Sequence, residues 1–113
     1  MCYYDAFPDS LRFSDTAISD NVWNHCVWNV SGNVGRWYIN GVADTTTYTI
    51  VATINPNVFG YSFSSYRNNC NIDEVGFFDA LTAPEIAQLY NSGNGLTYPF
   101  TVSANKSNFL LFF

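Results

Sequence analysis

The dipeptide Asn40-Gly41 lies between two segments that alternate in period two, and it constrains the fold more than any other feature of the chain. Both central residues of a type I′ turn need positive φ, which Asn and Gly tolerate best, so the pair predicts a two-residue β-hairpin. Its first strand is expected over residues 35–39 and its return strand from residue 41. The chain must therefore build antiparallel sheet around this turn.

Similar alternation recurs along most of the sequence and predicts further strands. Residues 22–30 are apolar on both sides, as in a strand that is covered on both faces. Residues 58–64 place three aromatic side chains on one face, and residues 72–79 point Val75 and Phe77 together. Turn-forming residues separate these segments, which is typical of a sheet made of several short strands.

The period changes after residue 81, where a single short helix is predicted. Thr82 and Glu85 have the spacing of a capping box. Three apolar residues then share one helix face, at i, i+3 and i+4: Ile86, Leu89 and Tyr90. A Ser-Gly pair ends the pattern, so the helix is expected near residues 83–91. Many strands with one small helix are typical of an all-β sandwich or barrel.

The composition fits one folded domain and excludes several function classes. The 113 residues are 48% hydrophobic and only 12% charged, which is too apolar for a disordered chain. The net charge of -5 lacks the basic footprint of nucleic-acid binders, so neither nucleic acid nor an anionic membrane surface is an expected partner. The longest apolar run, residues 109–113, is far shorter than the roughly 20 residues that span a bilayer, so no membrane insertion is expected.

The cysteines allow at most one internal disulfide. They are Cys2, Cys26 and Cys70, and three pairings stay open. None belongs to a C-x-x-C pair, and the single histidine, His25, cannot complete a zinc site of the usual spacing. Unpaired cysteine behaves as a small apolar residue, so we interpret these three as buried free thiols.

Three stretches of the sequence carry a family resemblance. They read N-V-W-N-H-C-V-W from residue 21, G-R-W-Y-I-N-G-V from residue 35, and I-D-E-V-G-F-F followed by L-T-A-P-E-I-A-Q-L-Y-N-S-G up to residue 93. Together they resemble the C-terminal portion of laminin-G-like, concanavalin A-like jelly-roll domains, a family of lectin, pentraxin and adhesion modules. Two positions depart from the family pattern, because Cys70 replaces its usual glycine and Gly76 its usual basic residue.

The resemblance implies an all-β, antiparallel jelly-roll β-sandwich with one short helix. Residues 1–100 would form a partial domain of this kind, and residues 101–113 an apolar C-terminal tail. The sequence supplies about six strands where a jelly roll has about eight. We therefore expect the chain to be a piece of a larger polypeptide, or a protomer that another chain or a second copy completes, because unpaired edges invite pairing. The N-terminus has no secretory pattern, so any export signal is expected outside this chain.

The carboxylates do not predict an enzyme. Glycoside hydrolases, which occur on this fold, need two carboxyl groups facing one sugar. Asp73 and Glu74 are neighbours on a predicted strand, where successive side chains point to opposite faces, and Glu85 is expected to cap the helix. His25 lies between two tryptophans, where a structural role is expected. A hydrolase fragment is the least favoured alternative.

The candidate site residues lie on loops beside the sheet. The expected ligand-binding rim is the loop before the Asp-Glu strand, with one aromatic, one basic and two amide side chains: Tyr66, Arg67, Asn68 and Asn69. The family resemblance also implies calcium, for which Asp73, Asp79 and Asp44 are candidate ligands; Asp73 could instead bond the neighbouring loop or helix. The tryptophans, Trp23 among them, are interpreted mostly as core.

These features predict a non-catalytic binding or adhesion module that recognises a glycan or a protein surface. The expected location is extracellular, on a cell surface or on a virion. The alternative is a structural component of a phage tail fibre or another surface assembly, which would bind no small ligand.

Overall fold

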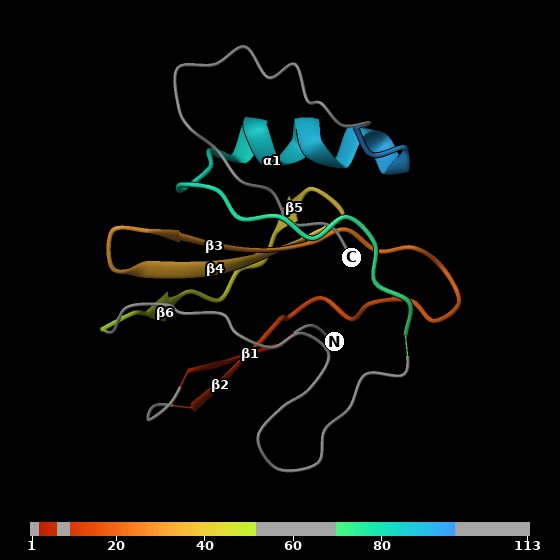
Figure 1. The fold of residues 1–113 in the computed structure, drawn as a ribbon. Helices are drawn as coiled ribbons and strands as arrows, with labels where there is room; N and C mark the ends of the chain where they lie inside the picture. The colour runs from red at the N-terminus through yellow and green to blue at the C-terminus, as the bar shows by residue number, and fades with distance from the viewer. Residues whose placement is uncertain (1–2, 7–9, 52–69, 97–113) are drawn as a thin grey trace.

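The structure, a computed structural model, describes residues 3–6, 10–51 and 70–96. The strands are β1 (Tyr3–Ala6), β2 (Ser10–Phe13), β3 (Cys26–Ser31), β4 (Val34–Ile39), β5 (Val42–Ala43) and β6 (Tyr48–Thr49). They are followed by α1 (Ala83–Tyr90) and the 3-10 turn η1 (Asn91–Gly93). Figure 1 shows three layers, in which α1 covers one side of the sheet around β4 and the β1–β2 pair lies on the other.

The central sheet is antiparallel and is built around β4. Strand β3 pairs along the whole of one edge of β4, from Cys26 opposite Ile39 to Ser31 opposite Val34. Strands β5 and β6 share the other edge. The predicted hairpin is confirmed, since Asn40 and Gly41 join β4 to β5 with φ of 52° and 78°, as a type I′ turn requires.

The face of the sheet toward α1 forms the main apolar core. Val27 and Tyr38 lie next to each other on β3 and β4 and pack against Ile86 of α1, which is completely buried. Leu89, one turn further along the helix, packs on Phe78, Leu81 and Leu96. The predicted helix and its apolar face are thus confirmed. Burying such side chains is worth about 2 kcal/mol each, which is enough to hold a helix too short to persist alone.

The start of α1 also follows the prediction. The Glu85 carboxylate accepts hydrogen bonds from the backbone N–H and the hydroxyl of Thr82, both at 2.7 Å, in a capping box. Proline in the first turn is compatible with this start, because the first helical N–H groups have no partner inside the helix. The helix ends at Asn91, whose φ of 46° is left-handed.

The opposite face of the sheet is aromatic and holds β2. Trp28 lies between Trp37 and Tyr48, with ring centroids 5.1 Å and 5.8 Å away. The Trp37 indole N–H donates to the Arg12 carbonyl at 3.0 Å, and the Tyr48 hydroxyl donates to the Phe13 carbonyl at 2.8 Å. These two bonds fasten the backbone of β2 beneath the sheet.

Two strand predictions were wrong. Residues 71–78 form no strand, because Glu74 takes a left-handed φ of 50° that breaks the extended path. Val75 and Phe77 are consequently more than a third exposed, whereas Gly76 is buried. Residues 22–25 precede β3 as a loop. The predicted strand at 58–64 lies outside the described residues.

The prediction of buried thiols is confirmed for one of the two cysteines that the structure describes. Cys26 is a buried thiol on β3. Cys70 is free but exposed, so the expectation that it is buried was wrong. Cys2 lies outside the described residues.

Candidate functional site

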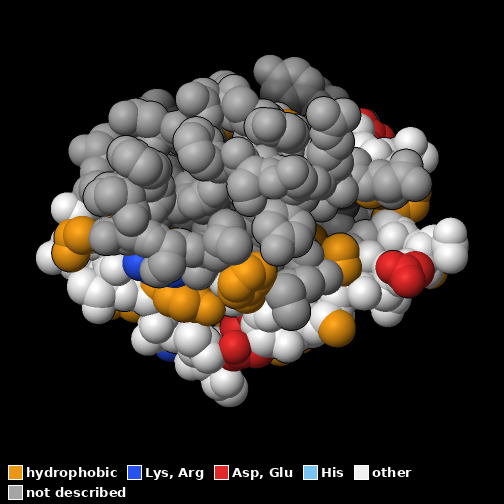
Figure 2. Space-filling view, turned by 90° about the horizontal axis from the view of Figure 1, so that it is seen from below, with side chains coloured by type: hydrophobic (Ala, Val, Ile, Leu, Met, Phe, Trp, Pro, Cys, Tyr) orange, Lys and Arg blue, Asp and Glu red, His pale blue; other side chains and the backbone are white. Residues whose placement is uncertain are grey.

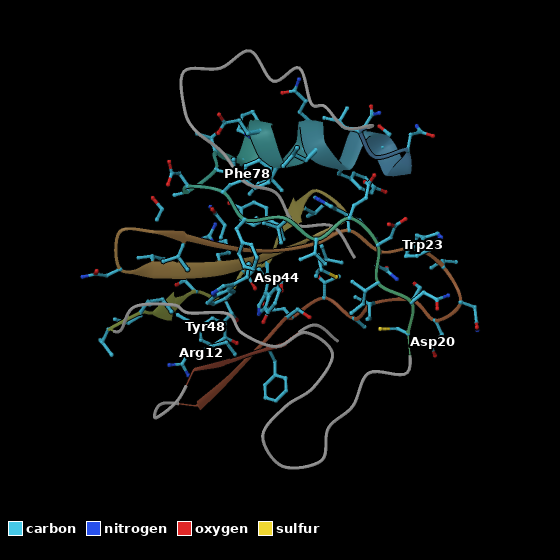
Figure 3. The ribbon with its side chains drawn as sticks, in the orientation of Figure 1. Arg12, Asp20, Trp23, Asp44, Tyr48 and Phe78 are labelled. Atoms are coloured by element: carbon cyan, nitrogen blue, oxygen red, sulfur yellow. The ribbon has the colours of Figure 1, made fainter. Side chains whose placement is uncertain are left out.

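The most exposed tryptophan of the chain lies on the loop between β2 and β3. The Trp23 side chain is 64% exposed, and its neighbour Val22 is 59% exposed. Figure 3 shows Trp23 at one end of the molecule, on the same loop as Asp20 and away from the core. The expectation that Trp23 is core was therefore wrong. We call residues 19–24 the Trp23 loop.

The Trp23 loop is closed by its own hydrogen bonds. The Asn24 side-chain Nδ2 donates to the Ser19 carbonyl at 2.9 Å and to the Val22 carbonyl at 3.0 Å. Asn21 takes a left-handed φ of 59°, which turns the chain at the tip of the loop. A single amide group therefore fixes the backbone on both sides of this turn and holds Trp23 in an exposed position.

The base of the Trp23 loop is fastened to the turn between β4 and β5. The Asn40 N–H donates to the His25 carbonyl at 2.8 Å, and the His25 N–H donates to Asn40 Oδ1 at 2.9 Å. The Asn40 Nδ2 group faces Asn24 Oδ1 at 3.4 Å. The β4–β5 turn thus serves as the platform on which the Trp23 loop stands.

The His25 side chain belongs to this platform. The imidazole is buried and stacks on the Tyr90 ring of α1, with centroids 5.9 Å apart and planes 25° apart. Burial lowers the pKa of His25 to about 4, because the charged form loses its hydration. The ring is therefore neutral near pH 7 and contributes packing between the loop base and the helix.

A second surface feature lies on the aromatic face. The Arg12 guanidinium stands over the Tyr48 ring, 5.3 Å from its centroid, as in a cation–π contact. Phe13, beside it in β2, is 40% exposed. Figure 2 looks at the molecule from below and shows hydrophobic side chains of the described residues with both basic and acidic side chains beside them. Arg12 is thus occupied by an internal contact.

The residues predicted as a ligand-binding rim, Tyr66, Arg67, Asn68 and Asn69, lie outside the described residues. Their role stays a prediction.

The candidate calcium ligands are not gathered together in the described part of the chain. Asp73 and Asp79 are both exposed, and Asp73 Oδ1 accepts the Glu74 N–H at 2.9 Å. Asp44 is buried, and its carboxylate accepts hydrogen bonds from the Asp15 N–H, the Thr16 N–H and the Thr16 hydroxyl. Among the described residues, no group of three or more His, Cys, Asp or Glu side chains could hold a metal ion.

The acidic residues considered for hydrolysis are placed differently from the expectation. Asp73 and Glu74 do not lie on a strand, so the alternation of faces does not describe them. Glu85 does cap α1, as predicted.

Two features of the site were not predicted from the sequence, the Asp44 contacts and the Trp23 loop. For the Trp23 loop a signal was present, because the Asp20-Asn21 pair favours a turn and could have shown that the chain bends before β3.

Comparison with known families agrees with this architecture. The family model described as the concanavalin A-like lectin/glucanases superfamily matches residues 5–87. Neither a search of curated proteins nor a search of solved structures gave a match. Laminin-G-like domains of this superfamily are commonly binding modules and are typically extracellular. In the described residues, no helix has the length and apolar character needed to cross a membrane. By this match and by its antiparallel fold, the chain belongs to the concanavalin A-like lectin/glucanase superfamily.

Proposed function

We propose that the chain is a non-catalytic recognition module that binds a glycan through the Trp23 loop. The observation that carries this proposal is the exposure of Trp23, at 64%, on a loop closed by the two Asn24 hydrogen bonds. A large apolar ring that is both exposed and held in place can bind a ligand without first being ordered, which lowers the entropic cost of association.

The chemistry of a sugar fits this arrangement. One face of a pyranose ring carries C–H groups that can lie flat on an indole, while its hydroxyls need polar partners. Asp20 and Asn21, on the same loop, supply a carboxylate and an amide for hydroxyls. Burying roughly 100 Å² of apolar surface contributes about 2.5 kcal/mol. Because association itself costs several kcal/mol, this contact with one or two hydrogen bonds predicts weak binding, with a Kd on the order of millimolar or weaker.

The charges favour an uncharged glycan. Among the described residues the cationic side chains are Arg12 and Arg36. Arg12 is engaged with Tyr48, on the opposite side of Figure 3 from Trp23. Arg36 lies four residues before the Asn40 turn, about 13 Å along a strand. An anionic sugar at Trp23 would therefore meet the Asp20 carboxylate without a counterion from the part of the chain that the structure describes.

The test is a titration with uncharged oligosaccharides, for which a glycan screen first selects the probe. Trp23→Ala is expected to weaken binding at least tenfold. Val42→Ala is the matched control, because Val42 is 67% exposed and lies on β5, outside the Trp23 loop. Equal affinity of both variants, or binding confined to sulfated or sialylated glycans, would contradict the proposal.

Calcium at Asp73 and Asp79 is a separate proposal that the same titration tests. Both side chains are exposed, and carboxylate oxygens are suitable ligands for this ion. If calcium contributes, removing it with a chelator weakens glycan binding, and Asp73→Asn gives the same loss. An unchanged affinity would reject calcium and leave the role of Trp23 intact.

A second candidate function is a structural part of a larger surface assembly, such as a phage tail fibre. The observation that favours it is the exposed apolar side chains of the segment before α1: Ile72, Val75 and Phe77, each 37% to 39% exposed. Such side chains favour contact with another chain. This alternative expects a stable oligomer by light scattering that Val75→Asp dissociates, together with no hit in the glycan screen.

A further inference from the structure

We infer that Asn40 is a positioning residue for the Trp23 loop, in addition to forming the turn between β4 and β5. This inference deepens the proposed function and rests on it for its effect on glycan affinity. Its effect on loop order can be measured without any ligand. The observation behind it is the juxtaposition of the Asn40 side-chain amide with both the start of β3 and the Asn24 amide.

The two amide groups form a continuous chain of hydrogen bonds. Asn40 Oδ1 accepts the His25 N–H at 2.9 Å, which fixes the orientation of the Asn40 amide. Asn40 Nδ2 then faces Asn24 Oδ1 at 3.4 Å. Asn24 Nδ2 in turn donates to the Ser19 and Val22 carbonyls, on both sides of the loop tip. The turn is linked in this way to the backbone that carries Trp23.

Neither amide can reverse its orientation without losing hydrogen bonds. If the Asn24 amide flipped, its oxygen would face the carbonyls of Ser19 and Val22. If the Asn40 amide flipped, its NH₂ group would face the N–H of His25. An amide has one accepting and one donating end, and each end here has a matching partner. The 3.4 Å contact is long and weak by itself, but the orientation that it completes is fixed from both sides.

The turn by itself does not require asparagine at this position. A type I′ turn accepts Asp-Gly or Gly-Gly nearly as well as Asn-Gly, because all of these tolerate positive φ. Asn40 has a φ of 52° and is followed by Gly41 at 78°. What Asn40 has and Asp lacks is the NH₂ donor. The donor is the atom group that faces the Trp23 loop.

Asn40→Asp isolates this donor. The variant keeps the turn and keeps an oxygen to accept the His25 N–H, but it places a carboxylate oxygen against Asn24 Oδ1. Either the Asn24 oxygen and the new carboxylate oxygen then repel each other, or the Asn24 amide flips and loses its hydrogen bonds to the Ser19 and Val22 carbonyls. Asn40→Gly is the second variant, because it removes the whole amide and keeps the left-handed φ. Asn33→Asp is the matched control, since it adds the same charge to the exposed turn between β3 and β4.

The experiment measures three quantities on each variant: the heteronuclear NOE of the Trp23 backbone amide, the thermal midpoint, and the affinity for the uncharged oligosaccharide selected above. The inference expects both Asn40 variants to lower the Trp23 NOE toward values of a flexible loop. The heteronuclear NOE values of β3 and β4 should stay those of a rigid backbone. The Asn33→Asp control should leave the NOE values of the Trp23 loop, β3 and β4 unchanged. A loop that is binding-competent a tenth of the time weakens the apparent affinity about tenfold.

The outcomes separate the inference from the proposed function. A rigid Trp23 amide in both Asn40 variants overturns the positioning role. So does a loss of rigidity that spreads equally over β3 and β4, because that is a general loss of structure. A mobile Trp23 loop on a rigid sheet supports the positioning role whether or not glycan binds. If the wild-type chain with its ordered loop binds no glycan, the proposed function fails and the positioning role stands.

Discussion

Asp44 and Asp15 each hold the loop that carries the other, although 29 residues separate them. Asp44 Oδ2 accepts the Asp15 N–H at 2.6 Å. Asp15 Oδ2 accepts the Thr46 N–H at 2.7 Å and the Thr45 hydroxyl at 2.9 Å. The loop after β2 and the loop after β5 are thereby joined by two reciprocal carboxylate contacts. One of the carboxylates, Asp44, is only 5% exposed.

Replacing Asp44 is expected to destabilise the fold. Asp44→Ala removes the acceptor of three partly buried hydrogen bonds, which the Asp15 N–H, the Thr16 N–H and the Thr16 hydroxyl donate. Hydrogen bonds to a charged group are worth about 1.5 to 3 kcal/mol, so a loss of about 2 to 3 kcal/mol is expected in urea unfolding. Asp79→Ala, at an exposed carboxylate, is the control and should stay within about 0.5 kcal/mol of the wild type. A similar small change for Asp44→Ala would contradict this structural role.

Stability is expected to fall between pH 6.5 and pH 4 because of His25. Burial lowers the pKa of His25 in the folded chain to about 4, against 6.5 when it is exposed. The unfolded chain then binds a proton more readily than the folded one. The contribution of neutral His25 to the free energy of unfolding is therefore fully present above pH 6.5 and is lost as the pH falls toward 4. By linkage the loss at pH 5 relative to pH 7 is on the order of 2 kcal/mol.

The control for this pH dependence is His25→Phe, which keeps an aromatic ring beside Tyr90 and cannot be protonated. Urea unfolding of this variant should change much less between pH 7 and pH 5. Equal slopes for both chains would assign the pH dependence to other groups.

Gly35 is expected to be intolerant of a larger side chain. A Cβ at this position on β4 would overlap the ring of Trp28 on the neighbouring strand. Overpacking of this kind costs about 1 to 3 kcal/mol, so Gly35→Ala should lower the free energy of unfolding by that amount. Ser31→Ala, at an exposed position of the same hairpin, should be close to neutral. A neutral Gly35→Ala would show that the Trp28 ring can move aside.

Asn29 is expected to tie the segment before α1 to β3. Its Nδ2 donates to the Leu81 carbonyl at 2.9 Å, and its Oδ1 accepts the Leu81 N–H at 3.0 Å. Asn29→Ala removes both bonds and should cost about 1 to 3 kcal/mol. Hydrogen exchange at the Leu81 amide should rise more than exchange in β4. Unchanged protection of Leu81 would contradict the role given to Asn29.

The sequence predicted those elements whose causes are local. The Asn40-Gly41 hairpin and the Thr82 helix start depend on residues within four positions of one another, and both were confirmed. The segment 72–79 has a strand-like pattern, but pairing is a long-range choice. A left-handed Glu74 breaks the extended path within this segment, and Asn29, 52 residues away, holds Leu81 just after it.

The candidate site was harder to predict for the same physical reason. Alternation of apolar residues placed Trp23 on a strand, because a pattern of residue types does not register a side-chain hydrogen bond that bends the backbone. Asn24 closes the loop five residues back, onto Ser19, and so turns Trp23 outward. The buried Asp44 was likewise predicted only as a candidate ligand, because its donors lie 28 and 29 residues away.

The most direct test of the recognition site follows the three indole N–H signals while an uncharged oligosaccharide is added. Trp23 is exposed, whereas Trp37 is buried and donates to the Arg12 carbonyl, and Trp28 packs between aromatic rings. The Trp23 signal is expected to shift and saturate while the Trp28 and Trp37 signals stay in place. A saturable shift of Trp28 or Trp37 with Trp23 unmoved, or no shift at any of the three at saturating sugar, would contradict this expectation.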